Sequence, residues 1–280
     1  IMAMEVAQAG LDVLALERGP DRATVPDFAY PAMLDELTYG VRNGLMSRPR
    51  DSTLTIRRVL DETALPYRVL GSFLPGEGVG GAGVHWNGHT WRAMPEEFRL
   101  RGYVVERFGE SAIPAGMTIQ DWGVSYEELE PHYDRFEYLC GISGSAGNLR
   151  GQIQQGGNPF EGPRARGYPL PPLPPTLNCA MFEKAARDAG YHPFPMPSAN
   201  ASGAWVNEYG MQLGPCNFCG FCERFGCINY SKASPQVCVL DALKRKPNFR
   251  YKVKCEVLRV EKARDGRSAS GVTYVDERGE

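Results

Sequence analysis

The order of apolar and polar positions at the start of the chain predicts a helix followed by a strand. Residues 1–9 are rich in Ala and Met and predict a helix, and Gly10 is a typical residue just after a helix C-terminus. Residues 11–16 form a nearly continuous apolar run, typical of a buried parallel strand, and the run ends at Glu17. This pattern predicts the second half of a βαβ unit.

The rest of the chain alternates helical and strand-like patterns with proline-rich and glycine-rich loops. Helical periodicity is present at 126–139, with Ser125 as its N-cap, and at 176–189 and 237–245. Strand patterns occur at 54–60, 67–74 and 248–260, and a turn at 265–266 predicts that 271–275 pairs as a hairpin. Seven prolines between residues 159 and 175 predict an extended arm or a linker between domains.

The amino-acid composition and net charge exclude some classes of function. The 280 residues carry a formal net charge of −2, which excludes a basic nucleic-acid-binding footprint as the main feature. Hydrophobic residues make up 42% and charged residues 23%, as in an ordinary globular protein. No apolar run approaches the roughly 18 to 20 residues that a membrane-spanning helix needs. The chain begins and ends inside elements, so we expect it to be an internal piece of a longer protein.

Residues 76–88 form a glycine-rich segment, GEGVGGAGVHWNG, in which six of thirteen residues are Gly. So many glycines predict a backbone that passes very close to a flat or charged group. His85, Trp86 and Asn87 add an imidazole, an indole and an amide to the same segment. The alternative is a flexible surface loop, although His and Trp are unusual in such a loop.

Glu17 is the second candidate for cofactor binding. In a dinucleotide-binding fold, an acid at the end of the second strand accepts hydrogen bonds from the adenosine ribose. The alternative is any α/β strand that happens to end in Glu.

Four of the eight cysteines lie within twelve residues, with the spacing C-x2-C-x2-C-x4-C at Cys216, Cys219, Cys222 and Cys227. Soft thiolate ligands that are this clustered suit an Fe–S centre or zinc, and the spacing is closest to a ferredoxin-like run. A loop this compact need not give all four thiolates to one cubane, so a three-iron cluster with three ligands is one of the options. A disulfide-linked loop or free thiols remain the alternatives. The other cysteines, at 140, 179, 238 and 255, are expected to be small buried side chains.

Five segments together resemble the glucose–methanol–choline (GMC) oxidoreductase family. They resemble most closely its bacterial membrane-associated branch, which includes gluconate 2-dehydrogenase, fructose dehydrogenase and the FAD-dependent glucose and sorbitol dehydrogenases. The segments that carry the resemblance are 10–19 (GLDVLALERG), 78–88 (GVGGAGVHWNG), 120–138 (QDWGVSYEELEPHYDRFEY), 158–172 (NPFEGPRARGYPLPP) and 214–235 (GPCNFCGFCERFGCINYSKASP). The last segment is the most specific, because GMC oxidases generally lack it.

The resemblance implies a mixed α/β fold, in which an FAD-binding Rossmann-like domain is interleaved with a substrate-binding domain. We expect residues 1–110 and 236–280 to belong to the FAD-binding domain, and 111–235 to be a substrate-side insertion with the Pro-rich arm and the Cys-rich loop. The residues that match the family's FAD contacts are Glu17, Gly80, Gly81, His85, Trp86, Asn87, Gly88 and Val257. His85 is also the candidate for a covalent link to FAD, with a non-covalent contact as the alternative.

The resemblance further implies a three-iron Fe–S cluster, favoured over a four-iron one, on Cys216, Cys219, Cys222 and Cys227. In the family branch this cluster passes electrons from flavin to a cytochrome c subunit or a quinone. A small subunit carries the export signal. We therefore expect a periplasmic protein that acts on a sugar, sugar acid or polyol, associates with the membrane through a partner, and binds no nucleic acid.

The catalytic residues are not expected within this chain. The family's catalytic base is a His paired with another His or an Asn, and none of the four histidines, at 85, 89, 132 and 192, matches it. We expect the pair beyond residue 280, and the leading glycine turn before residue 1. Two alternatives remain: a GMC-type oxidase whose Cys loop binds zinc or forms disulfides, and a zinc-stabilised non-enzymatic α/β module.

Overall fold

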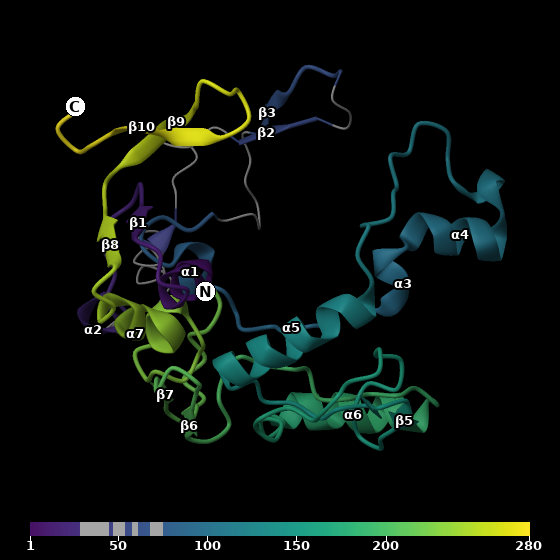
Figure 1. Cartoon of the computed structure of the whole chain (residues 1–280). Coiled ribbons are helices and arrows are strands. Elements are labelled where there is room, and N and C mark those ends of the chain that lie inside the picture. Colours follow the sequence, from purple (N-terminus) through teal and green to yellow (C-terminus); the bar gives the residue numbers. More distant parts are fainter. Residues whose placement is uncertain (29–44, 47–53, 58–60, 68–74) are drawn as a thin grey trace.

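The computed structural model has a mixed α/β fold, as the sequence predicts. It describes residues 1–28, 45–46, 54–57, 61–67 and 75–280. Helices and two-stranded sheets are both present, and long loops join them (Figure 1). Within the described residues, no helix combines the length and apolar character needed to cross a bilayer.

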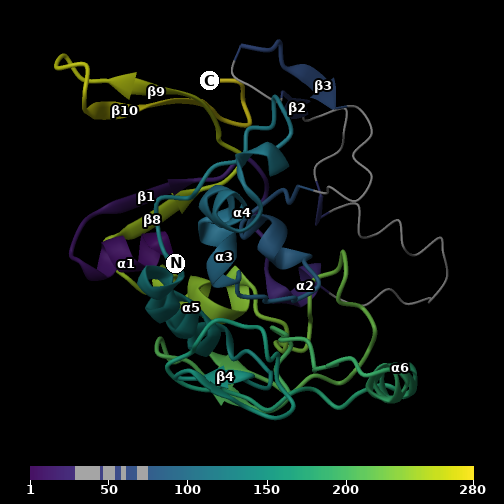
Figure 2. The same ribbon diagram turned by 90° about the vertical axis from the view of Figure 1, so that its right-hand side faces the viewer.

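The predicted helix–strand unit at the start of the chain is confirmed. Helix α1 spans Met2–Gln8, and Gly10 follows it with a φ of +84°, a conformation that glycine adopts without strain. Strand β1 (Val13–Leu16) pairs in parallel with β8 (Phe249–Lys252). The two strands run together in both views (Figures 1 and 2).

The expected burial of β1 is wrong for one of its two faces. Val13 and Ala15 pack against the core, whereas Leu14 is 51% exposed. Successive strand residues point to opposite faces, and the described part of the chain covers only the face that carries Val13 and Ala15.

The three other predicted helices are present and begin or end at the expected signals. Helix α5 (Tyr126–Cys140) starts at Ser125, whose hydroxyl accepts a hydrogen bond from Glu128 N at 3.2 Å. Helix α6 spans Leu177–Asp188. A π-helical turn, Gln236–Leu240, leads directly into α7 (Asp241–Lys244).

The predicted strand at 248–260 is two strands, because the chain leaves regular extended geometry between them. Lys254 has a φ of +56°, and Lys254 N and Cys255 N donate hydrogen bonds to Gly19 O and Glu17 O. Strand β9 (Glu256–Lys262) then forms the predicted antiparallel hairpin with β10 (Ala269–Val275). Residues 252–256 therefore pass over the end of β1.

The remaining elements are short. The strand predicted at 54–60 is met in part by β2 (Leu54–Ile56). The strand β3 (Leu65–Tyr67) shares only Tyr67 with the strand predicted at 67–74, and residues 58–60 and 68–74 lie outside the described residues. The short elements are α2 (Thr24–Asp27), β2 (Leu54–Ile56), β3 (Leu65–Tyr67), the 3-10 helix η2 (Gly81–Val84), α3 (Pro95–Phe98), α4 (Leu100–Phe108), the 3-10 helix η3 (Glu110–Ala112), β4 (Asn148–Leu149), β5 (Gln152–Ile153), β6 (Trp205–Val206) and β7 (Gln212–Leu213).

The main apolar core is built by α1, the end of α5, the π-helical turn and β8. Its buried side chains include Met4, Leu139, Ile142, Val237 and Phe249. Burial of such side chains supplies most of the stabilisation of a fold. Trp86, which belongs to the glycine-rich segment, packs against this core.

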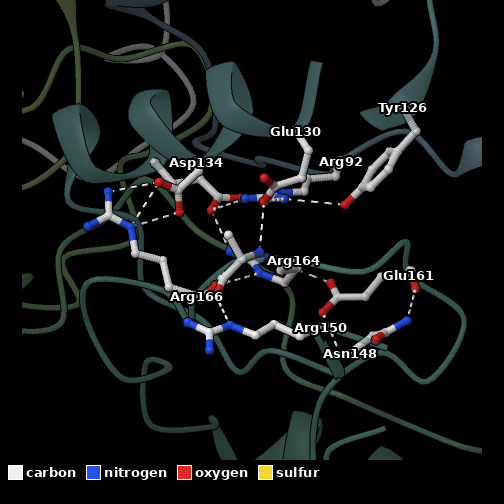
Figure 3. A network of polar contacts seen from close by, with 12 residues as sticks. Arg92, Tyr126, Glu130, Asp134, Asn148, Arg150, Glu161, Arg164 and Arg166 are labelled. Atoms are coloured by element: carbon white, nitrogen blue, oxygen red, sulfur yellow. Dashed lines mark hydrogen bonds and ion pairs between the residues drawn. The ribbon is translucent and has the colours of Figure 1, made fainter. Parts of the chain in front are cut away.

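A buried charge network fixes the proline-rich arm to α5 (Figure 3). Arg92 donates two hydrogen bonds to Glu137, at 2.8 Å and 2.9 Å, and a third to Glu130 at 2.9 Å. Arg164, from the arm, donates to the same Glu137, and its side chain is 0% exposed. The arm contains no helix, as predicted, and these ion pairs replace regular structure in holding it in place.

Candidate functional site

The end of β1 contacts the start of the glycine-rich segment. A Cβ atom on Gly19 would lie only 2.2 Å from Gly78 N, and Val79 N donates a hydrogen bond of 3.0 Å to Pro20 O. The carboxylate of Glu17 accepts a hydrogen bond of 2.7 Å from Gly19 N. Glu17 and the glycine-rich segment, about sixty residues apart in sequence, are therefore neighbours.

Val257 lies near the same end of β1. It is on β9, two residues after Cys255, whose N–H donates to Glu17 O at 2.8 Å. Its partner in the hairpin is Tyr274, and its side chain is 43% exposed. The structure thus brings Val257 and Glu17 to the carboxyl end of the β1–β8 pair.

The glycine-rich segment is packed tightly, unlike a flexible surface loop. Gly78, Gly80, Gly81 and Gly88 all have φ values between +54° and +107°, which glycine adopts without strain. A Cβ atom on Gly80 would lie 2.8 Å from the side chain of Gln236. Gly80 therefore approaches Gln236 closely, and the approach of this segment to a flat or charged group stays a prediction.

His85 is buried and incompletely hydrogen-bonded. Only 6% of the residue is exposed, and Nε2 has no hydrogen-bond partner among the described residues. Burial lowers the pKa of His85, and the charge of Lys232 lowers it further, although a backbone hydrogen bond opposes both. The imidazole is therefore neutral at pH 7, with a buried ring nitrogen that an additional group would satisfy.

Trp86 and Asn87 connect the glycine-rich segment by hydrogen bonds to two segments that are distant in sequence. Trp86 Nε1 donates a hydrogen bond of 2.8 Å to Ala233 O. Asn200 Nδ2 lies 3.5 Å from Asn87 O, and Ala199 N donates to Gly88 O at 2.7 Å. These bonds fix the segment against the residues on either side of the cysteine loop.

The cysteine loop, residues 214–230, carries four thiols that are all partly exposed. All eight cysteines are free thiols in the structure. Cys140, Cys238 and Cys255 are buried as expected, but the expectation is wrong for Cys179, which is exposed on α6. Phe218 N points at Cys216 Sγ at 3.4 Å, and Lys232 N points at Cys227 Sγ at 3.5 Å. Backbone N–H groups directed at cysteine sulfur are characteristic of Fe–S sites, where they tune the reduction potential.

The electrostatics of Cys222 link the four thiols. Burial raises the pKa of Cys222, and charges at the other three cysteines raise it further, while Lys232 lowers it. Cys222 is therefore the thiol of the loop on which burial and the neighbouring charges act together. Within the described parts of the chain, however, no three or more His, Cys, Asp or Glu side chains are already arranged as a metal site.

The glycine-rich segment and the cysteine loop meet directly. Arg224 N donates a hydrogen bond of 2.8 Å to His85 O. Lys232 Nζ donates to Trp86 O at 2.5 Å, to Cys222 O at 2.7 Å and to Phe225 O at 2.6 Å. The two segments, which are separate candidates in the sequence, thus form one site.

Lys232 is the residue of this site that sequence reasoning missed. Lys232 is 1% exposed, and burial lowers the pKa of its amine to about 8, so the ammonium prevails at pH 7. The available signal was a single basic residue among small ones, in the order Tyr230-Ser-Lys-Ala-Ser234. A lysine in such a run is usually on the surface, and only the tertiary contacts show that this one is not.

An apolar cavity of about 270 Å³ lies beside the glycine-rich segment. Gly83, Trp86, Leu139, Cys140 and Cys238 are among its lining residues, and the lining is predominantly apolar.

Comparison with known proteins identifies three relatives. The chain is 50% identical to a gluconate 2-dehydrogenase flavoprotein from Pantoea cypripedii over 282 residues, which cover all of this chain and 46% of that protein. It is 25% identical to the fructose dehydrogenase large subunit of Gluconobacter japonicus, over 72% of this chain and 34% of the relative. It is 30% identical to a 2-methyl-1,2-propanediol dehydrogenase from Mycolicibacterium austroafricanum, over 70% of this chain and 30% of the relative.

The solved structures are more distant. A pyridoxine 4-oxidase from Mesorbium loti aligns with all of this chain and 44% of its own, at 16% identity and a TM-score of 0.48. A formate oxidase aligns at 16% identity and a TM-score of 0.44, over 99% of this chain and 40% of its own. At these values the likeness supports no conclusion about the site. No family model matches the chain.

The match to the gluconate 2-dehydrogenase flavoprotein covers this chain completely and that protein only in part. The chain spans less than half the length of each of the three relatives. The 50% identity nevertheless runs across the whole chain and includes both segments of the candidate site. The chain belongs to the glucose–methanol–choline oxidoreductase family.

Proposed function

We propose that this chain is part of an FAD-dependent dehydrogenase that oxidises an alcohol group of a sugar, a sugar acid or a polyol. The observation that carries the proposal is the contact between the glycine-rich segment and the cysteine loop, through Arg224 N to His85 O and through Lys232. A dehydrogenase that passes electrons from a flavin to an Fe–S centre needs the two groups close together. The relative at 50% identity, named a gluconate 2-dehydrogenase flavoprotein, makes gluconate the first substrate to test.

The residues that would hold FAD lie along one connected surface of backbone. Glu17 and Val257 would contact the adenosine end, since both lie at the carboxyl end of the β1–β8 pair. Gly80, Gly81, His85, Trp86, Asn87 and Gly88 would line the flavin. The buried His85 Nε2, which has no hydrogen-bond partner in the described part of the chain, supports a contact between this imidazole and the cofactor, covalent or not.

The residues that would hold an Fe–S cluster are Cys216, Cys219, Cys222 and Cys227. The spacing of the four cysteines and the N–H groups directed at Cys216 and Cys227 support this assignment. We favour a three-iron cluster over a four-iron one, because a loop this compact need not give all four thiolates to one cluster and because the family branch that the chain resembles carries three irons. Loading would require the thiols to converge further than they do in the structure.

The chain's own residues would bind, orient and shield the two groups. FAD supplies hydride acceptance from an alcohol carbon, and a thiolate-bound cluster supplies one-electron transfer. The glycine backbone allows a flat ring to approach closely. Phe221 and Phe225, whose rings meet edge to face at 5.2 Å, would exclude water from the cysteine loop. No residue of this chain is assigned as the base that takes the substrate proton.

The proposal also covers the electron acceptor, the partner subunits and the location of the enzyme. Electrons would leave the cluster to a cytochrome c subunit or a quinone. A small subunit would accompany export, so that the enzyme works in the periplasm and associates with the membrane through its partner. The relatives named as a flavoprotein and a large subunit support a multi-subunit assembly.

The test is a spectroscopic and metal analysis of the full-length protein, purified without oxygen. We expect a flavin absorption spectrum, bound iron without zinc, an EPR signal in the oxidised state, and bleaching of the flavin by gluconate. Flavin without iron, together with oxygen consumption, would replace the relay with an oxidase. Zinc without flavin would overturn the proposal as a whole.

A matched pair of variants locates the metal. Cys219→Ala should lose iron and retain flavin, because the thiol is a proposed ligand. Cys179→Ala is the control, since Cys179 is exposed on α6 and outside the loop. Equal iron content in both variants would contradict the assignment of the cluster to the cysteine loop.

A further inference from the structure

Lys232 is a buried ammonium whose hydrogen bonds all go to backbone carbonyls. An ammonium group has three donors, and the three acceptors here are Trp86 O, Cys222 O and Phe225 O. The first belongs to the glycine-rich segment and the other two to the cysteine loop. One side chain thus ties together two segments that are 136 residues apart, from Trp86 to Cys222.

The backbone of Lys232 adds to this connection. Lys232 forms an isolated antiparallel bridge with Asn200, and its N–H points at Cys227 Sγ at 3.5 Å. Ala233 N donates a hydrogen bond of 2.8 Å to Ala199 O. Both the backbone and the side chain of Lys232 are therefore held by contacts to other segments.

The charge of Lys232 has no carboxylate partner among the residues that the structure describes. A buried charge is costly unless it is paired, and carbonyl dipoles compensate it only in part. The cysteine loop lies directly against this residue: Cys222 O accepts a hydrogen bond from the ammonium at 2.7 Å, and the N–H of Lys232 points at Cys227 Sγ at 3.5 Å. The site therefore holds a fixed cation beside a set of potential anionic ligands.

We propose that Lys232 is a positioning residue that holds the cysteine loop against the glycine-rich segment and acts as the buried counterion of the anionic centre formed on the cysteine thiolates. The counterion part rests on the proposed function, whereas the positioning part needs only the chain. A fixed positive charge favours the more negative, reduced state of a neighbouring redox centre. Removal of the charge therefore lowers the reduction potential of that centre.

The positioning part is tested by cysteine labelling of the full-length protein after removal of iron, with labelled sites located by mass spectrometry. Lys232→Met should increase the labelling rate at Cys222 by about tenfold or more, because it removes charged hydrogen bonds that hold the loop. This increase is expected although loss of the positive charge raises the pKa of the Cys222 thiol and by itself slows labelling. The matched control is Lys184→Met, since Lys184 lies exposed on α6. Unchanged labelling of Cys222 in Lys232→Met would overturn the positioning role.

Cys140 and Cys238 report whether the variant remains folded, because both thiols are buried in the core. They should stay protected in Lys232→Met. If they become labelled, the same comparison is made with Lys232→Gln, which keeps two donors and lacks the charge. Protected Cys222 in a folded Lys232→Gln protein would then refute the proposal.

The counterion part is tested by redox titration of the iron-loaded protein, followed by EPR. The midpoint potential should fall in Lys232→Met or Lys232→Gln and stay unchanged in Lys184→Met. An equal potential in all three proteins would overturn the counterion role. Absence of iron from the wild-type protein would remove the relay and the counterion role together, and the labelling result would still decide the positioning role.

Discussion

Glu137 on α5 offers the sharpest stability prediction, because its buried carboxylate is shared by two buried guanidinium groups. Arg92 donates to both of its oxygens, at 2.8 Å and 2.9 Å, and Arg164 donates to one of them. The exposed fractions of the three side chains are 3%, 0% and 3% for Arg92, Arg164 and Glu137. Glu137→Gln keeps the shape but places an amide N–H group against guanidinium donors.

The magnitude depends on the partners that each arginine retains. Arg92 keeps Glu130 at 2.9 Å, but the remaining carboxylate of Arg164 is Glu161, at 3.7 Å and beyond normal hydrogen-bond length. Removal of one partner from a buried ion pair costs about 3–5 kcal/mol. Since folded domains are stable by about 5–15 kcal/mol, Glu137→Gln should remove a large part of the free energy of unfolding.

The assay is urea unfolding followed by far-UV circular dichroism at pH 7. The control is Glu183→Gln, because Glu183 forms an exposed pair with Arg187 on α6, at 2.8 Å. This pair has the i,i+4 spacing, so the control should cost no more than about 0.5 kcal/mol. Adding Arg164→Met to Glu137→Gln should cost less than the sum of the two single changes, because the second removes the charge that the first leaves unpaired.

A free energy of unfolding for Glu137→Gln within about 0.5 kcal/mol of the control would refute this reasoning. Strict additivity of Glu137→Gln and Arg164→Met would also contradict it. In that case the network would not be what holds the proline-rich arm to α5.

Three further predictions concern the flavin, acid unfolding and thiol reactivity. Gly19→Ala should weaken FAD retention by the full-length protein, because the added Cβ would lie 2.2 Å from Gly78 N. Gly167→Ala, which has open space around it, should retain FAD as the wild type does. The measurement is flavin absorbance after gel filtration. Hydrogen bonds to a guanidinium and a tyrosine lower the pKa of Glu5 below 4.5, so its stabilisation is present above that pH and is lost as the pH falls through the lowered value. Between pH 5 and pH 3, the free energy of unfolding of Glu5→Gln should therefore fall less than that of the wild type. Identical dependence of the free energy of unfolding on pH in the two proteins would contradict this. Cys179 should react with a thiol reagent in the native protein at pH 8, whereas Cys140, buried and with its pKa raised by a hydrogen bond and burial, should not; equal rates would contradict the core assignment.

Local patterns in the sequence determined most of the helices and the hairpin of this protein. The Ser125 cap, the apolar periodicity of α5 and the glycine after α1 act within a few residues, so a linear pattern encodes them. The spacing of the cysteines and the density of glycines at 76–88 are likewise local, and they located both halves of the candidate site. The sequence also supported the parallel character of β1, but not its exposed second face.

Only the tertiary structure decided which of these local features meet. The bond from Lys232 to Trp86 spans 146 residues, and the bond from Arg92 to Glu137 spans 45 residues. A lysine or a glutamate in the sequence carries no sign of its distant partner, and both residue types usually lie on the surface. Burial of Lys232 and Glu137 results from long-range packing, because the backbone segments that surround each of them come from separate parts of the chain. That packing turns two separate sequence motifs into one site.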